Sequence, residues 1–161
     1  FSCLPTLTMT SMGLPSGPLR TSSKPTPHSF AARPNTGLET GLDMDGNGYT
    51  GDARDAQGYG RFSGDGGMAI LSRYPIGELR DLSAILWKDV EDATLPTVDG
   101  ALFPSEEAIV IQRLSTTGHW IVPISMPNGP PLTLMVWSAT PLVFDGPEDR
   151  NGLRNRDELR L

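Results

Sequence analysis

"EEAIVIQRLSTTGHWIVPISMPNGPPLTLMVWSATP", residues 106–141, is the stretch that decides the fold predicted for this chain. Its apolar segments AIVIQRLS and HWIVPISM are expected to form one long or broken strand, and LTLMVWSA is expected to form the partner strand. The turn between them is PNGPP, in which the Asn-Gly pair is the strongest short signal for a β-hairpin. The sequence therefore predicts an antiparallel hairpin across this stretch.

Further strands are predicted on the N-terminal side of the hairpin. HSFAAR, residues 28–33, is expected to form a short strand that Pro34 ends. GGMAILSRYPI, residues 66–76, is a compact apolar run bounded by glycines and by Pro75, as is typical of a buried strand. LRDLSAILWKDV, residues 79–90, has apolar residues at a spacing compatible with a helix, so a helical or mixed segment is expected there.

The segment after the hairpin, LVFDGPEDRNGLRNRDELRL, is expected to pass through a charged turn into a helix. Asn151 or Asn155 is a suitable N-cap residue. The acidic residues Asp157 and Glu158 are then expected in the first turn, where they would favour the positive end of the helix dipole. Strands joined by long irregular loops, with a helix at the end, predict an α/β or α+β sandwich.

The composition fits one domain, because the chain has 161 residues and 37% of them are hydrophobic. The formal charge of -6 argues against a surface that coats nucleic acid nonspecifically, which requires many basic residues. That charge is compatible with a phosphate substrate, since a bound metal reverses the local sign. One cysteine permits no internal disulfide. No apolar run approaches the ~20 residues that a membrane span needs.

The chain is expected to divide near Pro34. Residues 1–27 are rich in Ser, Thr and Pro and have no lasting period, so residues 1–33 are assigned to a disordered or aberrant lead-in. Residues 34–161 are assigned to the domain. The first residue is Phe and both ends resemble cuts, so the sequence is expected to be a fragment of something longer.

Residues 34–66 form a connection rich in glycine and aspartate, and connections of roughly 30 residues are generally functional or disordered. Within it, Asp43, Asp45 and Asn47 occupy positions 1, 3 and 5 of an EF-hand calcium loop. Position 12 of that loop should supply a bidentate glutamate, and Arg54 stands there. The EF-hand pattern therefore fails.

Two interpretations of this connection stay open. In the first, it is a looser loop for Ca²⁺ or a structural cation, in which Asp52 or Asp55 substitutes for the missing ligand. In the second, Asp and Asn side chains cap their own turns while the glycines adopt positive φ angles. The second is the more usual use of these residue types.

Polar residues also interrupt the hairpin stretch. Arg113 and His119 lie in or beside strands, between apolar runs. A lone histidine is more often a hydrogen-bonded structural residue than a catalyst. The alternative is a metal-assisted phosphoryl-transfer site. There the acidic residues of the turns 43–55 and 145–149 hold a divalent ion that activates water, and His or Arg meets the charge on the nonbridging oxygens.

The chain resembles a bacterial branch of the endonuclease/exonuclease/phosphatase family in five segments: PNTGLETGLDMDGNG, DAQGYGRFSGDGGMAILSRYPI, LWKDV, RLSTTGHWIVP and ATPLVFDGPEDRNGLRNRDELRL. The resemblance runs from Pro34 to Leu161, and FDGPEDRNG is its most specific motif. It implies an α/β fold, a partial four-layer α/β/β/α sandwich with long irregular loops. It also implies a hydrolase that acts on phosphoester bonds with a divalent metal, Mg²⁺ or Mn²⁺. Relatives of this branch are often exported, which implies a secreted or periplasmic location.

The resemblance also implies which residues belong to the site, which the family builds from loops at one end of its sheets. Ser138 stands where the family places a histidine, and a serine cannot carry an imidazolium charge. His119 or Arg113 is therefore expected to stabilise the phosphate, and Asp145 is a further catalytic candidate. The family's early Asn and Glu strands and its later Asp-x-Asn and Asp-His motifs have no counterpart in this sequence.

Three functions are consistent with these patterns. The first is the middle section of a metal-dependent phosphoesterase, expected to be inactive alone because ligands are missing. The second is a secreted, calcium-stabilised binding module without catalysis, which rests on Asp43, Asp45 and Asn47. The third is a fragment that folds poorly because sheet edges and an apolar sheet face stay uncovered.

Overall fold

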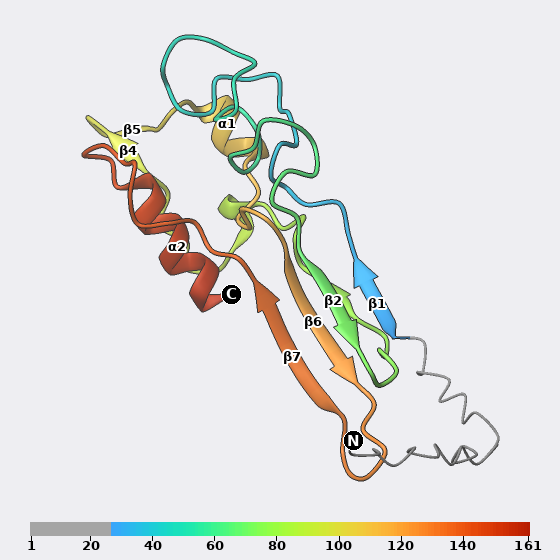
Figure 1. Ribbon diagram of the computed structural model, residues 1–161. Helices are drawn as coiled ribbons and strands as arrows, with labels where there is room; N and C mark the ends of the chain where they lie inside the picture. Colours follow the sequence, from blue (N-terminus) through green and yellow to red (C-terminus); the bar gives the residue numbers. More distant parts are fainter. Residues whose placement is uncertain (1–26) are drawn as a thin grey trace, which may run out of the picture.

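The computed structural model describes residues 27–161, in which short helices and strands combine in a mixed α/β arrangement with small antiparallel sheets (Figure 1). The strands are β1 (His28–Ala31), β2 (Ala69–Ser72), β3 (Arg80–Asp81), β4 (Thr97–Val98), β5 (Ala101–Leu102), β6 (His119–Ile124) and β7 (Leu132–Trp137). The helices are the 3-10 helix η1 (Trp87–Asp89), α1 (Glu106–Ile111) and α2 (Arg150–Arg160). In this part of the chain, no helix has the length and apolar character that crossing a membrane requires. The first 26 residues of the expected lead-in lie outside the described residues.

The predicted hairpin is confirmed. Strands β6 and β7 pair antiparallel in a continuous register from His119 opposite Trp137 to Ile124 opposite Leu132. The turn contains Gly129, whose φ of 121° lies where side-chain-bearing residues are rare. Strand β3 pairs with the other edge of β6, which gives a three-stranded sheet in the order β3-β6-β7.

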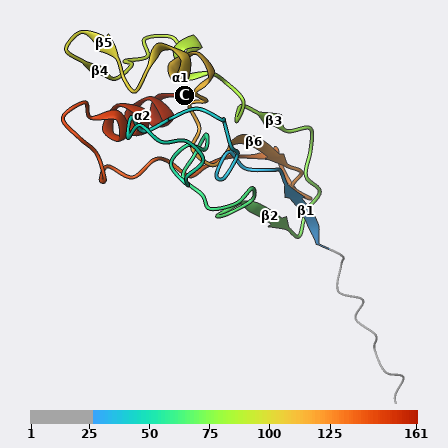
Figure 2. The ribbon, with the colours of Figure 1, turned by 90° about the horizontal axis from the view of Figure 1, so that it is seen from above.

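A two-stranded ribbon of β1 and β2 packs against this sheet. Both strands are predicted by the sequence, but β2 is shorter than expected and only Ile70 in it is buried. Phe30 of β1 meets Trp120 of β6 edge to face, with ring centroids 4.9 Å apart. The buried residues of this contact are Ile70, Trp120, Val122 and Ile124. One cluster of the core therefore lies between the ribbon and the sheet, while other buried apolar residues, such as Trp87, Ile109 and Leu114, lie outside it. Helix α2 and the β4–β5 hairpin lie at the other end of the molecule (Figure 2).

Residues 106–111 form helix α1 and not the predicted strand. The hydroxyl of Ser105 caps the helix by accepting a hydrogen bond from the N–H of Ala108, at 3.1 Å. Glu106 and Glu107 occupy the first turn, where negative charge is favourable. These start signals outweigh the β-branched residues that favour a strand, so the predicted strand begins only at His119.

Residues 79–90 are mixed and contain no α-helix. Arg80 and Asp81 pair with β6, opposite Ile121 and Trp120. The apolar residue Trp87 is buried at the start of the 3-10 helix η1. The mixed segment that the sequence allows is therefore confirmed and the helical alternative is wrong, because pairing with β6 holds the first part of the segment in an extended conformation.

Helix α2 begins at Arg150, and neither Asn151 nor Asn155 is its N-cap, so that prediction was wrong. Asp149 occupies the cap position in a left-handed conformation and makes no side-chain capping bond. Asp145 supplies the capping carboxylate instead, because its Oδ2 accepts the N–H groups of Asn151 (2.6 Å) and Gly152 (3.1 Å). The predicted first-turn residues Asp157 and Glu158 lie later in the helix and are buried.

Asn35 anchors the connection of residues 34–66 to the hairpin region. Its side chain is buried, and its Nδ2 donates to the carbonyl oxygens of Ser83 (2.7 Å) and Ser115 (2.6 Å). Farther along, Gly58 runs so close to Thr116 that a Cβ at this position would collide with the Thr116 carbonyl oxygen. The long connection is therefore held against the body of the protein at two places.

Candidate active site

A cleft of about 910 Å³ lies where the glycine- and aspartate-rich connection, the segment after β7 and the start of α2 come together. Three residues that the sequence singles out line it: Asp45, Ser138 and Asp145. The other polar residues of the lining are Arg54, Thr116, Thr140, Glu148, Arg150, Asn151 and Arg154, and the aromatic ones are Tyr59, Phe103 and Phe144. Charges of both signs therefore face one cleft that also has an aromatic part.

Asp145 is fixed at the cleft by the start of α2. Its Oδ2 accepts the two N–H groups of Asn151 and Gly152, while its Oδ1 accepts no hydrogen bond from the described residues. The side chain is exposed. Asp145 therefore presents one free carboxylate oxygen in a fixed orientation.

Arg150 is a partly buried cationic residue at the cleft. Its Nη2 donates to Oε1 of Gln112 at 2.6 Å, and its Nε is buried without a partner among the described residues. Burial lowers the pKa of the Arg150 guanidinium, against the opposing effect of Asp45, Asp145 and Glu148. None of these carboxylates lies within ion-pair distance of it in residues 27–161. An anion entering the cleft would therefore give Arg150 its first direct ionic partner.

Arg154 lies beneath Arg150 on the next turn of α2 and is buried. Its guanidinium donates to the carbonyl oxygens of Gln57 (2.7 Å), Arg113 (2.8 Å) and Leu114 (2.8 Å). Burial lowers the pKa of Arg154 to about 10, partly offset by the nearby Glu158. Because Nε and Nη2 donate to backbone carbonyls, Arg154 is held in place as part of the lining of the cleft.

Glu158 joins α2 to the wall of the cleft. Its Oε1 accepts the backbone N–H of Thr116 (2.7 Å) and the Thr116 hydroxyl (2.9 Å), and its Oε2 accepts the N–H of Thr140 (2.6 Å). Ser138 follows β7 directly and precedes this anchor by two residues, with its side chain exposed to the cleft. The end of β7 and the start of the following segment are thereby held in place.

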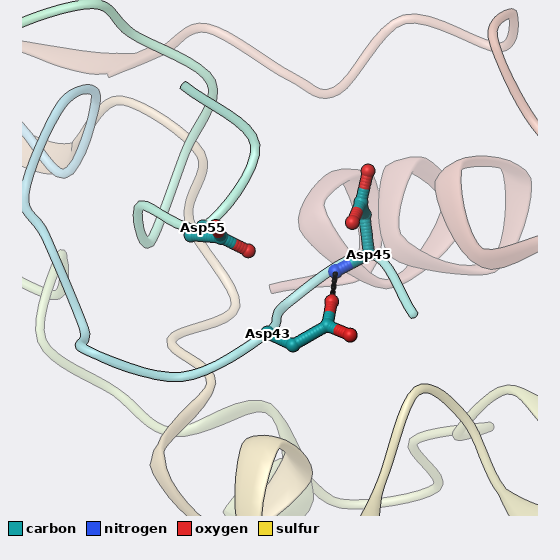
Figure 3. Close-up of side chains that lie close together, drawn as sticks. All are labelled: Asp43, Asp45 and Asp55. Carbon is teal, nitrogen blue, oxygen red and sulfur yellow. Dashed lines mark hydrogen bonds between the residues drawn. The ribbon is translucent and has the colours of Figure 1, made fainter. Parts of the chain in front are cut away.

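Asp43, Asp45 and Asp55 form an acidic triad in the glycine- and aspartate-rich connection (Figure 3). One carboxylate oxygen of each lies within 4.8 Å of the others. Asp45 also pairs with Arg54 at 3.2 Å, but the Arg54 side chain is 66% exposed, so this pair is weak. The triad joins the cleft through Asp45.

The carboxylates of the triad already accept backbone hydrogen bonds. The N–H groups of Gly46 and Gly48 each donate to Asp43 at 2.7 Å. Burial raises the pKa of Asp43, but the donors in residues 45–48 outweigh it and hold the pKa below the usual value. Asp55 accepts the N–H of Met44 at 2.9 Å. This is the self-capping loop that was the second interpretation of the sequence.

The triad nevertheless has ligand capacity left, because a carboxylate offers about four lone-pair sites. Three carboxylate oxygens are the donor set that hard divalent cations prefer, so the residues fit Mg²⁺, Mn²⁺ or Ca²⁺. Asn47 does not belong to the set: its side chain donates to Asp52 at 3.1 Å and accepts the N–H of Tyr49 at 2.8 Å. Asp55, which the sequence offers as a substitute ligand, is the third member of the set.

Arg113 and His119 do not line the cleft. Nη1 of Arg113 donates to Oδ1 of Asn35 at 2.8 Å, which places this side chain in the anchor of the long connection. The His119 ring is buried and stacks on Trp137, with centroids 5.5 Å apart and planes 11° apart. Burial lowers the pKa of His119 against the opposing charge of Glu158, and its Nδ1 has no partner among the described residues.

The sequence did not single out Arg150, although it lies in the segment FDGPEDRNG that carries the resemblance. The signal available for it is its place at the start of a helix, five residues after Asp145. Comparisons of the chain with models of protein families, with curated proteins and with solved structures found no match.

Proposed function

We propose that residues 34–161 are the middle section of a hydrolase domain of the endonuclease/exonuclease/phosphatase family, whose members act on phosphoester bonds with the help of a divalent metal. The observation that carries the proposal is the cleft, in which Asp45 of the acidic triad lies with Ser138, Asp145 and Arg150. Each of the first three is singled out by sequence for a separate reason. Their assembly in one cleft is what a phosphoester site requires.

The packing of the strands supports the sandwich that this family implies. The β1–β2 ribbon and the β3-β6-β7 sheet enclose one apolar core between them, as the inner layers of a two-sheet sandwich do. Helices α1 and α2 lie beyond the ends of these strands and not on the sheet faces (Figure 1), so the outer helical layers are proposed from the resemblance alone. We propose that these elements are part of a four-layer α/β/β/α sandwich.

In this proposal the acidic triad of Asp43, Asp45 and Asp55 holds Mg²⁺ or Mn²⁺, with Ca²⁺ as the alternative. A divalent ion polarises the phosphoryl group and lowers the pKa of water. Arg150 meets the negative charge on the nonbridging phosphate oxygens, and the Ser138 hydroxyl donates one further hydrogen bond.

The hydrolysis proposed is a displacement at phosphorus. The oxygen of a water molecule bonds to phosphorus as the ester P–O bond breaks, and the leaving alcohol finally takes up the proton that the water released. The free Oδ1 of Asp145 is the group in the cleft suited to accept that proton first. His119 has no part in this scheme because its ring is buried away from the cleft.

Binding of inorganic phosphate tests the proposal first, because binding needs fewer groups than catalysis does. We would titrate phosphate into the full chain by calorimetry, with Mn²⁺ and with a chelator. Phosphate is expected to bind only with the metal, and Arg150→Gln is expected to weaken it by about tenfold or more. Arg150→Lys keeps the charge and is expected to weaken binding less.

Arg61→Gln is the matched control, because Arg61 is exposed in the long connection and does not line the cleft. It is expected to bind phosphate as the unchanged chain does. Metal-dependent release of 4-nitrophenol from 4-nitrophenyl phosphate is the second readout, and the chain alone is expected to release little because the family's other ligands are missing. If phosphate binds equally well without the metal and in the Arg150→Gln variant, the proposal is refuted.

A second function, a calcium-stabilised binding module without catalysis, is favoured by the acidic triad alone. It predicts stabilisation of the fold by Ca²⁺ without any effect of Ca²⁺ or Mn²⁺ on phosphate binding. The same titrations therefore separate the two functions.

A further inference from the structure

Two aromatic side chains stand exposed at the cleft. Tyr59 comes from the glycine- and aspartate-rich connection and is 61% exposed, and Phe144 comes from the segment after β7 and is 94% exposed. We call these two residues the aromatic pair. Exposed aromatic surface on a cleft wall is typical of a place where a ligand is bound.

The backbone of Phe144 is held in an unfavourable conformation. Its φ is 62°, in the left-handed region that a bulky residue rarely adopts. The side-chain amide of Asn151 donates to the carbonyl oxygens of Val143 (2.9 Å) and Phe144 (3.3 Å). The neighbouring Asp145 is fixed by N–H groups of α2. The start of α2 therefore maintains a strained turn whose side chain packs on little else in the protein, and strain of this kind is concentrated at binding and catalytic sites.

Polar and aromatic groups thus divide the lining of the cleft. Arg150, which has no ion-pair partner among the described residues, is suited to an anionic group. The aromatic pair is suited to a flat apolar group, since aromatic rings stack on one another with a preference beyond area burial. A single ligand that satisfies both has an anionic head and a planar aromatic body.

We propose that the cleft binds phosphate esters whose organic group is a planar aromatic ring, with the phosphate at Arg150 and the ring against Tyr59 and Phe144. The phosphate part rests on the proposed function, whereas the aromatic preference rests on the exposure and strain of the aromatic pair. Aryl phosphates and nucleoside phosphates share this chemistry. Alkyl phosphates lack the ring.

The test compares ligands that share a phosphate group. Phenyl phosphate, glycerol phosphate and inorganic phosphate are titrated into the full chain in the presence of Mg²⁺. Phenyl phosphate is expected to bind more tightly than glycerol phosphate, by about two- to tenfold. Adenosine monophosphate is a further arm: tighter binding than phenyl phosphate assigns the ring to a nucleoside, and weaker binding assigns it to a simple aryl group.

Variants of the aromatic pair test whether these two residues cause the preference for phenyl phosphate over glycerol phosphate. Phe144→Ala and Tyr59→Ala are each expected to remove most of the preference for phenyl phosphate and to leave the binding of inorganic phosphate unchanged. Tyr59→Phe keeps the ring and is expected to keep the preference. The matched controls are Phe62→Ala and Tyr49→Ala, because these rings are 64% and 77% exposed but do not line the cleft.

Three results would overturn the inference. They are equal affinity for phenyl phosphate and glycerol phosphate, a preference that survives both alanine variants, and an equal loss in the control variants. If phosphate binding still depends on Arg150, each of these three results overturns only the aromatic preference, and the proposed function is unaffected. If instead benzyl alcohol, which has the ring but no phosphate, binds as tightly as phenyl phosphate, then the cleft does not recognise phosphate and the proposed function is refuted as well.

Discussion

The indole N–H of Trp87 donates a hydrogen bond of 2.8 Å to Oδ2 of Asp157, and this bond joins η1 to α2 across 70 residues of chain. Both side chains are buried, with exposed fractions of 0% and 1%. The same carboxylate oxygen accepts the N–H of Thr94 at 3.1 Å. Because α2 carries Arg150 and Arg154 into the cleft, this contact helps to fix where these two arginines lie.

Replacing Asp157 should therefore destabilise the protein. Asp157→Ala leaves the Trp87 N–H buried without an acceptor, and we expect the free energy of unfolding to fall by about 1–3 kcal/mol. Urea denaturation followed by tryptophan fluorescence measures the change. Asp92→Asn is the control, because its pair with Arg160 at 3.6 Å is exposed and should contribute less than about 1 kcal/mol, and Asn tolerates the φ of 57° at this position. Equal losses in the two variants would contradict the role assigned to Asp157.

Acid should destabilise the protein through His119. Burial lowers its pKa in the folded state below the ordinary 6.5, so between these two values the unfolded chain binds more protons than the folded one. The contribution of neutral His119 to the free energy of unfolding is then complete above pH 6.5 and declines as the pH falls below that value. It is lost once the pH is below the pKa of His119 in the folded protein. Urea midpoints measured between about pH 7.5 and about pH 5 report this slope.

Matched variants assign the slope to one residue. His119→Gln is expected to flatten it, whereas His28→Gln should leave it unchanged, since His28 is exposed and is the only other histidine in the chain. A slope that persists in His119→Gln would contradict the prediction.

A divalent cation should stabilise the fold through the acidic triad. A ligand present at a hundred times its Kd adds about 2.7 kcal/mol to the free energy of unfolding, which calorimetry detects as a higher Tm than in chelator. Asp45→Asn should abolish this increase with little loss of stability in chelator, because the pair with exposed Arg54 is weak and the Asn oxygen can still accept the N–H of Asn47, as Oδ1 of Asp45 does at 3.3 Å. Asp99→Asn is the control, since Asp99 is exposed, lies in the β4–β5 turn and has a φ of 49° that Asn tolerates. Comparing Mg²⁺, Mn²⁺ and Ca²⁺ identifies the preferred ion, and an unchanged Tm in all three would exclude the site.

Relieving the strain at Phe144 should stabilise the protein. Asn adopts the left-handed conformation more readily than Phe, and the ring is too exposed to contribute packing. We expect Phe144→Asn to raise the free energy of unfolding by about 1 kcal/mol, while phenyl phosphate binds more weakly. Phe62→Asn should give no such gain, because Phe62 is exposed without a positive φ. A loss of stability in Phe144→Asn would show that the turn is not strained.

Local patterns in the sequence were sufficient for the hairpin. The Asn-Gly turn and the two apolar runs around it specify β6 and β7 without reference to the rest of the chain. Residues 106–111 carry competing signals, since Ile109, Val110 and Ile111 favour a strand while Ser105 and the two glutamates favour a helix. The helix forms because the cap and the first-turn charges satisfy its free N–H groups.

The cleft, in contrast, could not be derived from sequence spacing. Arg154 contacts Gln57 across 97 residues, and Glu158 contacts Thr116 across 42. The pattern at the end of the chain indicates only a charged helix, and nothing local shows that Glu158 is buried. Asp45, Ser138 and Asp145 were identified as candidates, but their meeting in one cleft with Arg150 depends on how α2 docks.

The most direct test of the proposed phosphoester site is a map of the backbone amides whose chemical shifts change when phosphate binds. Inorganic phosphate is titrated into isotope-labelled protein with Mg²⁺, and chemical shifts are followed by nuclear magnetic resonance. The predicted result is a set of shifts confined to the cleft, at Asp45, Ser138, Asp145 and Arg150. Shifts centred on His119 and Trp137 with none at the cleft, or no shifts at all, would contradict the placement of the site.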